Sequence, residues 1–581
     1  MAGYLGTADG PAAADARASY AGRRQWRRVA QPVGAMSVRQ SLSVVPVLWA
    51  LVAPCAYGQA AVPPTVTPGA LGHQSNEMAR HYLHRHAQSK VWVPVIHVNP
   101  QRKQHLPAPG GPHFVLRKVV FTPSHFLTKS ELDAVIRPYM GHSVDYRDLG
   151  LIVRRIDGLY EKAGILTGRA ILPPQVVRNG IVRIDLIEGR LGQVVVSGNR
   201  YTKTRTIIQS LGLRPGAVID VRTLRAALIN YNRNNPDQLN AALRPGASFG
   251  LTNIDILTAE PPRYSAEVFA DNEGVSSTGR YEGGVYLGDR SLFGYNDSLS
   301  GYALASGGST YGYLAYDVPV TDSGGRAGVS FDRSQIAIIR GPYQGINITG
   351  HSWTSAVNYT QPFLSSIHWQ LDGVASVTDT ESVTDISGVS LGRTDLPGAS
   401  LGEDLHYYAS GTSVDFESAI AYDLASVPLT PERRLEIFTG ATSWFQQIMG
   451  PWSTLVRIGW QWSPQANLPS VSLYQLGGAE NLRGYNQGLV AGDVGYTVTG
   501  EIRRVVTPWF TALAFVDQGS VFAPHPATLT LTDVGVGGQW RWRSWLSGTL
   551  SVAYADHMVV PDQRPYQVFA RIVFTPDALF E

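Results

Sequence analysis

The segment STLVRIGWQWS, residues 453–463, alternates between two unlike faces. Side chains of a β-strand point alternately to opposite sides of a sheet. One face here carries Thr454, Val456, Ile458, Trp460 and Trp462, and the other carries Leu455, Arg457, Gly459 and Gln461. The pattern predicts a strand with one apolar face and one face that holds the charge.

The same alternation recurs in residues 494–503, 539–543 and 567–574, within strand-like segments that begin at Arg263. A lipid-facing Arg or Lys at the bilayer midplane costs about 2–4 kcal/mol, against a typical net stability of about 5–15 kcal/mol. We therefore predict that residues 263–581 form a transmembrane β-barrel with its charges turned to the lumen. A soluble β-sandwich or propeller is the alternative, but the charged faces are sparse and no repeat of blade length occurs.

The first 60 residues are predicted to be an extension and a secretory signal peptide. An apolar run over residues 42–57 follows several arginines, and small residues favour cleavage near residues 58–61. Met36 is an alternative start. No later run of about 18 apolar residues occurs, so no membrane-spanning helix is expected. The sole cysteine, Cys55, lies in this leader, which excludes disulfides from the mature chain. The net charge of +3 gives no indication of nucleic-acid binding.

Residues 113–262 are predicted to hold two α+β units, over residues 113–189 and 190–262, each with the order β-α-α-β-β. In the first unit, a helix carries one apolar face at helical spacing: Leu149, Ile152, Val153, Ile156, Leu159 and Tyr160. In the second, Asp220 is expected to cap a helix. Pro261-Pro262 marks the exit from these units.

Residues 61–112 contain a polar helix-compatible stretch, residues 71–90, before a Pro/Gly-rich linker. Its side chains are polar almost all round, so the helix should sit in water or in a polar cavity. The polar residues are Glu77, Arg80, His81, His84 and Arg85. The two histidines are three residues apart, as metal ligands can be, but no third ligand accompanies them, and we expect no metal site.

Two motifs predict a contact inside the barrel. In Leu482-Arg483-Gly484-Tyr485, Arg483 is expected at the tip of a loop able to bend tightly, and Phe515-x-Asp517-x-Gly519 places three residues on one strand face. Asp517 would not be tolerated against lipid, and Gly519 removes a side chain where another backbone must come close. We predict that the Arg483 guanidinium binds the Asp517 carboxylate as a latch. The alternative is that Arg483 decorates an external loop and Asp517 lines a wet lumen.

The chain resembles a two-partner secretion transporter of the outer-membrane assembly-factor superfamily, the exporters of haemolysin and filamentous haemagglutinin. The resemblance rests on Gly477-Gly478-x4-Arg483-Gly484-Tyr485 with residues 515–519, and on residues 184–199 and 271–280. It implies a barrel of about 16 antiparallel strands, two POTRA domains and a plug helix near residues 71–90. The last strand is expected to end at Phe574 or, alternatively, at Phe580.

The resemblance also implies function. POTRA domains in the periplasm would capture an unfolded partner, for example by strand addition to a sheet edge, and the barrel would export it across the outer membrane without nucleotide hydrolysis. The expected partners are a large secreted adhesin or haemolysin, outer-membrane lipid with lipopolysaccharide, and the barrel-assembly machinery. No catalytic residue, cofactor or nucleic acid is expected.

Three other classes of protein fit less well. A barrel-assembly insertase usually carries more than two POTRA units, and a passive porin would not need the soluble units. A membrane enzyme is suggested by the G-x-S-x-G match at residues 388–392. That motif needs a strand-turn-helix context, which is missing here.

Overall fold

The computed structural model describes residue 65 and residues 67–75, 93–98, 111–165, 167–427, 431–522, 528–560 and 563–576. The predicted extension and signal peptide lie outside the described residues. So do Glu77, Arg80, His81, His84 and Arg85 of the predicted plug helix. Within the described part of the chain, no helix is long and apolar enough to cross a membrane.

The first α+β unit contains β2 (Phe114–Val115), β3 (Lys118–Phe121), α2 (Lys129–Ile136), a 3-10 turn (Arg137–Tyr139), β4 (Ser143–Val144), α3 (Tyr146–Lys162), β5 (Gly168–Ile171) and β6 (Ile181–Glu188). Its sheet has the order β3-β6-β5. Asp145 caps α3 in a capping box with Asp148. The apolar face predicted for α3 is buried in the core of the unit, apart from Leu159, which is partly buried. Residues 114–121 at the start of the unit contain two short strands, β2 and β3.

The second α+β unit contains β7 (Arg190–Ser197), α4 (Thr204–Ser210), α5 (Val221–Asn234), β8 (Gln238–Pro245) and β9 (Leu251–Ala259). Asp220 caps α5 as predicted, because its side chain accepts a hydrogen bond from the Arg222 N–H. A fourth strand, β1 (Ile96–Val98), pairs in parallel with β8. The sheet order is β1-β8-β9-β7, so the chain's own linker occupies the β8 edge.

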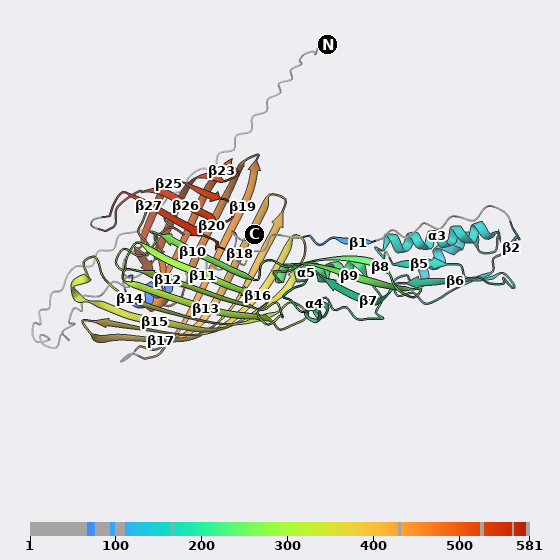
Figure 1. Cartoon of the computed structure of the whole chain (residues 1–581), viewed down its shortest axis with the longest axis horizontal. Helices are drawn as coiled ribbons and strands as arrows, with labels where there is room; N and C mark the ends of the chain where they lie inside the picture. Colours follow the sequence, from blue (N-terminus) through green and yellow to red (C-terminus); the bar gives the residue numbers. More distant parts are fainter. Residues whose placement is uncertain are drawn as a thin grey trace, which may run out of the picture. The chain divides into compact units, whose positions relative to one another are not determined.

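Sixteen strands among the described residues close into a barrel, each pairing with the next barrel strand (Figure 1). They are β10 (Tyr264–Asp271), β11 (Glu282–Arg290), β12 (Ser298–Ser306), β13 (Ser309–Pro319), β14 (Arg326–Ala337), β15 (Ile348–Ser365), β16 (Trp369–Ile386), β17 (Val389–Ala409), β18 (Thr412–Ala425), β19 (Arg433–Met449), β20 (Trp452–Trp462), β23 (Val494–Thr507), β24 (Phe510–Phe522), β25 (Leu529–Trp542), β26 (Leu546–Ala555) and β27 (Tyr566–Phe574). The last strand thus ends at Phe574. Closure is antiparallel, through Val268–Asp271 of β10 and Arg571–Phe574 of β27.

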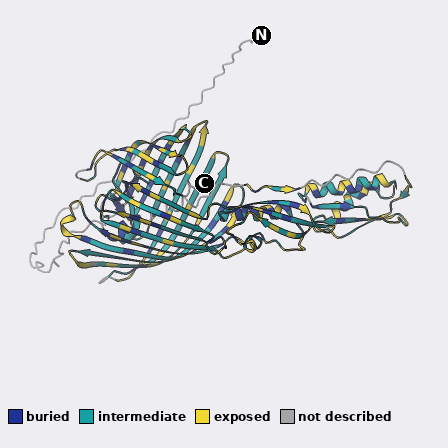
Figure 2. Cartoon of the chain, in the orientation of Figure 1, coloured by how far each residue is buried: buried dark blue, intermediate teal, exposed yellow. Residues whose placement is uncertain are grey.

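The two faces of the barrel wall differ as the alternation predicts. Large apolar side chains such as Val377 and Val536 are each 61% exposed, whereas Asp517 and Asp533 are almost fully buried. Figure 2 shows buried, intermediate and exposed positions following one another along the barrel strands. The exposed apolar side is the side that lipid covers, because membrane strands place apolar residues outward and polar residues inward. The match to G-x-S-x-G begins at Gly388 in the turn between β16 and β17 and continues into β17, so a strand and not a helix follows the turn there.

A long loop between β20 and β23 folds back against the inner wall. It contains a short 3-10 turn (Ser470–Ser472) and a small hairpin of β21 (Tyr474–Leu476) and β22 (Val490–Gly492). Leu476, Leu482 and Tyr485 of this loop are fully buried, against Val521 of β24 and Leu531 of β25. The loop therefore occupies part of the lumen.

Residues 68–75 form a helix that also lies against the inner wall. Leu71 packs with Ile336 and Ile348, and the Ala70 carbonyl accepts a hydrogen bond of 2.8 Å from Gln475 of the lumenal loop. The helix begins earlier than the predicted residue 71, because Pro68 is favourable at a first helical position and Thr67 precedes it.

Candidate functional site

The tip of the lumenal loop is shaped by tight turns. Gly477 adopts a positive φ of 105°, and a side chain there would fall 2.2 Å from the Asn486 carbonyl oxygen. The Tyr485 N–H donates to the Leu482 carbonyl at 3.2 Å, which closes a turn around Arg483. This turn directs Arg483 at the barrel wall.

The guanidinium of Arg483 holds two carboxylates on neighbouring strands. Its Nε lies 2.8 Å from Asp517 Oδ2 and its Nη2 lies 2.8 Å from Oδ1, so the contact is bidentate. Its Nη1 lies 2.6 Å from Oε1 of Glu501 on β23. The guanidinium also lies over the Phe515 ring, 3.3 Å from the centroid. The side chains of Arg483, Glu501 and Asp517 are 7%, 2% and 0% exposed.

Glu501 is the centre of a wider ion-pair network. Arg503 Nη2 lies 2.5 Å from Glu501 Oε2, and an Arg457 nitrogen lies 3.7 Å from Oε1. Buried charges are tolerated when they are paired and hydrogen-bonded, and removal of one partner of such a pair costs about 3–5 kcal/mol. Arg483 therefore joins the loop to the inner wall by contacts that are costly to break singly.

The glycines of both motifs make room for close packing. A side chain at Gly519 would lie 2.8 Å from Leu482 Cδ1, 3.0 Å from Leu476 Cδ2 and 3.1 Å from the Tyr496 carbonyl oxygen, so loop side chains and the backbone of the neighbouring strand β23 both approach this position. A side chain at Gly484 would lie 2.5 Å from Asp533 Cβ. Tyr485 is fully buried, and its hydroxyl donates to the Thr532 carbonyl at 3.1 Å.

Two acidic residues of this site were not among the predicted site residues. Glu501 lies on the face that alternation assigns to the lumen, so that pattern was a usable signal. Asp533 is the direct cross-strand partner of Asp517. Its position beside Asp517 depends on the register of β24 and β25, which the sequence pattern does not specify. In the described part of the chain, no three His, Cys, Asp or Glu side chains are grouped so that they could hold a metal ion.

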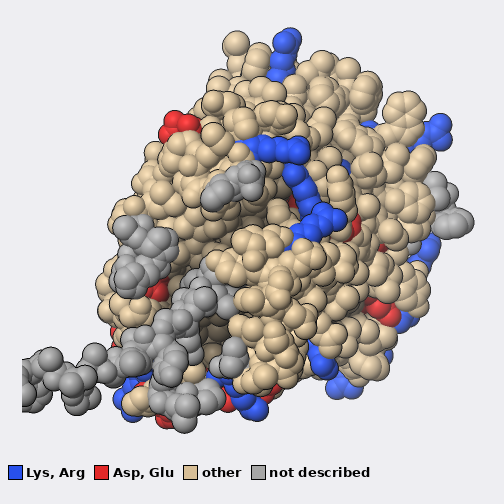
Figure 3. Space-filling model, turned by 90° about the vertical axis from the view of Figure 1, so that its left-hand side faces the viewer, with Lys and Arg blue, Asp and Glu red and all other residues tan. Residues whose placement is uncertain are grey.

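A cavity of about 280 Å³ remains inside the barrel beside the helix of residues 68–75. It is lined mainly by hydroxyl-bearing and small side chains, among them Ser352, Ser376, Thr378 and Thr439. On the face shown in Figure 3, the surface is hollowed and Lys and Arg side chains line part of the hollow. The lumen thus combines a polar wall with two inserted segments, the loop and the helix.

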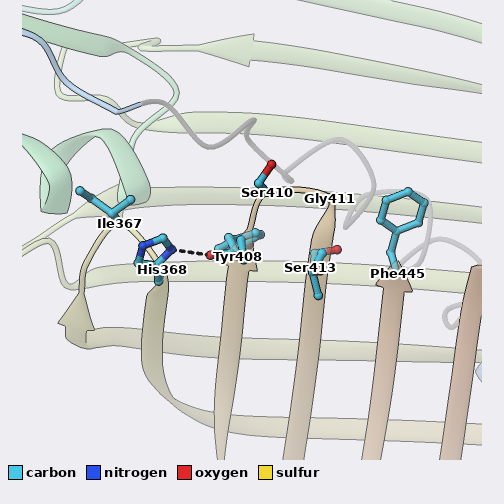
Figure 4. Close-up of a pocket in the computed structure, with 9 residues that line it drawn as sticks. Ile367, His368, Tyr408, Ser410, Gly411, Ser413 and Phe445 are labelled. Carbon is cyan, nitrogen blue, oxygen red and sulfur yellow. Dashed lines mark hydrogen bonds between the residues drawn. The ribbon is translucent and has the colours of Figure 1, made fainter. Parts of the chain in front are cut away.

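A second pocket, of about 430 Å³, lies at the barrel end that contacts α5 (Figure 4). It is lined by His368, Tyr408 and Phe445 from three neighbouring hairpins, and His368 Nδ1 lies 2.8 Å from the Tyr408 carbonyl. Arg233 of α5 donates to the carbonyls of Ser366 and Ile367 at 3.1 and 2.6 Å. These contacts join the second α+β unit to the barrel rim.

A closed barrel with small α+β units before it and a loop arginine bound to its inner wall is the architecture expected of an outer-membrane transporter. The family model for the POTRA domain, ShlB-type, matches residues 114–189. The model for the haemolysin secretion/activation protein ShlB/FhaC/HecB matches residues 250–539. The chain belongs to this family and is an outer-membrane transporter of the two-partner secretion type. Its α+β units are accordingly periplasmic.

Curated relatives agree with this assignment. The outer membrane transporter CdiB of Dickeya dadantii is 23% identical over 214 residues, which is 37% of each chain. The heme/hemopexin transporter protein HuxB of Haemophilus influenzae is 21% identical over 405 residues, 67% of this chain and 71% of that protein. The match thus spans little more than a third of the Dickeya transporter.

Two solved structures share the fold. CdiB from Escherichia coli has a TM-score of 0.63 and 18% identity over 88% of this chain and 99% of that one. CdiB from Acinetobacter baumannii has a TM-score of 0.62 and 17% identity over 87% of this chain and 98% of that one.

Proposed function

We propose that this transporter captures a large secreted partner in an unfolded state with its periplasmic units and passes it outward through the barrel, without nucleotide hydrolysis or other catalysis. The observation that carries the proposal is the filled lumen. The loop that Arg483 anchors and the helix of residues 68–75 both lie against the inner wall, so both must move before a polypeptide can pass. A passive porin would have no need for such closure.

Capture by strand addition fits the sheets of the two periplasmic units. In the second unit β1 already occupies the edge of β8, with Ile96 packed against the core. Among the described residues, the outer strands are β1 and β7 in the four-stranded sheet of this unit, and β3 and β5 in the three-stranded sheet of the first. An extended segment of the partner can add main-chain hydrogen bonds at such an edge, while side-chain pockets give specificity. Apart from the short strands β2 and β4, the second unit repeats the order of strands and α-helices of the matched POTRA domain, and we propose that it is a second POTRA domain.

Two further partners belong to this proposal. The apolar outer face of the barrel contacts outer-membrane lipid and lipopolysaccharide, and the barrel is inserted into the outer membrane by the barrel-assembly machinery.

The proposed export function is tested by co-expressing the chain with a neighbouring reading frame for a very large, repeat-rich secreted protein. That protein should reach the medium only when the transporter is present. Equal secretion without the transporter would contradict the proposal.

The junction between the second α+β unit and the barrel should loosen as pH rises. Asp237 accepts a hydrogen bond of 2.6 Å from Thr202, which also lies 3.1 Å from Ser291 of the barrel. Burial, with Glu260 nearby, raises the pKa of Asp237 to about 6, above the usual value of about 3.9. The pKa of Asp237 is higher in the folded protein than in the unfolded chain, so the protonated carboxyl group stabilises the folded state. This contribution to stability is complete below about pH 4 and is lost as pH rises through about 6.

Hydrogen exchange measures this effect. After correction for intrinsic rates, amides of residues 231–237 should be better protected at about pH 5 than at about pH 7.5. In Asp237→Asn the difference should disappear, since the amide does not titrate. Equal protection at both pH values in the wild-type protein would show that Asp237 does not control the junction.

A further inference from the structure

The second half of the loop motif contacts a strand to which neither motif points. Arg483 binds β23 and β24, but Gly484 and Tyr485 lie against β25, at Asp533 and Thr532. Asp533 is 1% exposed and faces the same side of the wall as Asp517, its direct partner across the strands. The tip of the loop therefore contacts three strands of the inner wall, β23, β24 and β25, and not only the first two.

The three carboxyl groups of the site differ in how many guanidinium groups each one contacts. Three guanidinium groups, of Arg483, Arg503 and Arg457, surround Glu501. Asp517 receives both bidentate hydrogen bonds from Arg483 and a third contact from the Arg483 backbone N–H at 3.3 Å. No cation is paired with Asp533 among the described side chains, and neither of its oxygens accepts a hydrogen bond of ordinary geometry there.

An ionised carboxylate in that position would be strongly unfavourable. A buried charge without a partner costs far more than a buried neutral group, and a second anion directly beside Asp517 adds repulsion. Asp517 and Asp533 are direct partners across β24 and β25, a pairing that places their Cβ atoms about 4.5–5.5 Å apart, and a side chain at Gly484 would lie 2.5 Å from Asp533 Cβ. A proton on Asp533 removes the repulsion and gives Asp517 a donor on the side that Arg483 does not cover.

We propose that Asp533 is a positioning residue of the latch: it carries a proton, donates it in a hydrogen bond to Asp517, and supports the loop tip at Gly484. This inference rests on the proposed function, because the latch matters only if the loop must be held and released during export. It assigns a role to β25, and it explains why the motif needs glycine at position 484, where a side chain would meet Asp533.

Two substitutions of Asp533 separate this role from the alternatives. Asp533→Asn keeps the size and a hydrogen-bond donor, so the partner should still be secreted at the wild-type level. Asp533→Ala removes the donor and should lose most secretion, while the barrel remains folded by its resistance to unfolding in detergent. Loss in both variants would mean that a negative charge is required, and full secretion by the alanine variant would mean that Asp533 has no role. Either result overturns the proposal.

Infrared spectroscopy gives a second readout that does not depend on secretion or on the alanine variant. The wild-type transporter should show the carbonyl stretch of a protonated carboxyl group at neutral pH, and Asp533→Asn should lack it. An identical spectrum in the two proteins would overturn the shared proton. If the spectra differ as expected but the wild-type chain secretes nothing, the proposed function fails and the assignment of Asp533 stands.

Discussion

Replacing Arg483 with alanine should abolish secretion of the partner while leaving the barrel inserted in the outer membrane. The substitution leaves Asp517 without its bidentate partner and removes one of the cations around Glu501. Removing one partner of a buried ion pair costs about 3–5 kcal/mol, which is enough to release the loop. This cost is smaller than the free energy of unfolding of many proteins, about 5–15 kcal/mol, so the barrel should stay folded. The measurement is partner in the medium relative to transporter in the membrane fraction. Asp517→Ala should behave in the same way.

Matched variants show whether the bidentate contact matters. Arg483→Lys keeps the charge but not the planar fork, so it should restore secretion only in part. Arg503→Ala is the control, since Arg503 pairs with Glu501 and is more exposed than Arg483; it should retain most secretion. Wild-type secretion by both Arg483→Ala and Asp517→Ala would remove the latch from the mechanism.

Replacing Gly72 with leucine should open the resting pore. A side chain at this position would fall 2.2 Å from Ser352 Oγ and 2.6 Å from Ser334 Oγ. A serine hydroxyl can rotate away from a methyl group, but a leucine side chain also needs the volume that the wall occupies. The helix of residues 68–75 should therefore leave the wall, and ion conductance in planar bilayers should rise severalfold.

The control for added bulk is Gly345→Leu, because open space surrounds Gly345. Its conductance should match that of the wild-type protein. Deleting residues 71–90 should raise conductance at least as much as Gly72→Leu does. Unchanged conductance in both the leucine variant and the deletion would mean that this helix does not plug the lumen.

Much of the fold follows from patterns that a single sequence displays. The alternation in residues 453–463 separates Trp462, which is exposed, from Leu455, which is buried. It does so because a strand in a barrel wall has one lipid face and one lumenal face. The loop arginine and the wall aspartate were predictable as a pair, since a buried carboxylate on the lumenal face needs a cation.

The parts that were not predicted depend on register and on distant pairing. Asp533 lies opposite Asp517 only because of how β24 and β25 align, and one sequence does not specify that alignment. The strand β1 is only three residues long and pairs with β8, far along the chain. Its hydrogen bonds are made by the backbone, and so short a segment has no periodicity to reveal it.

The central claim is that the partner passes through the lumen of this barrel, and site-specific photo-cross-linking during secretion tests it most directly. A photoreactive residue at Ser376 would face the lumenal cavity, and one at the neighbouring Val377 would face lipid, since that side chain is 61% exposed on the outer wall. We predict that the partner cross-links to position 376 and not to position 377. Cross-linking at position 377 with none at 376 would contradict transport through the lumen.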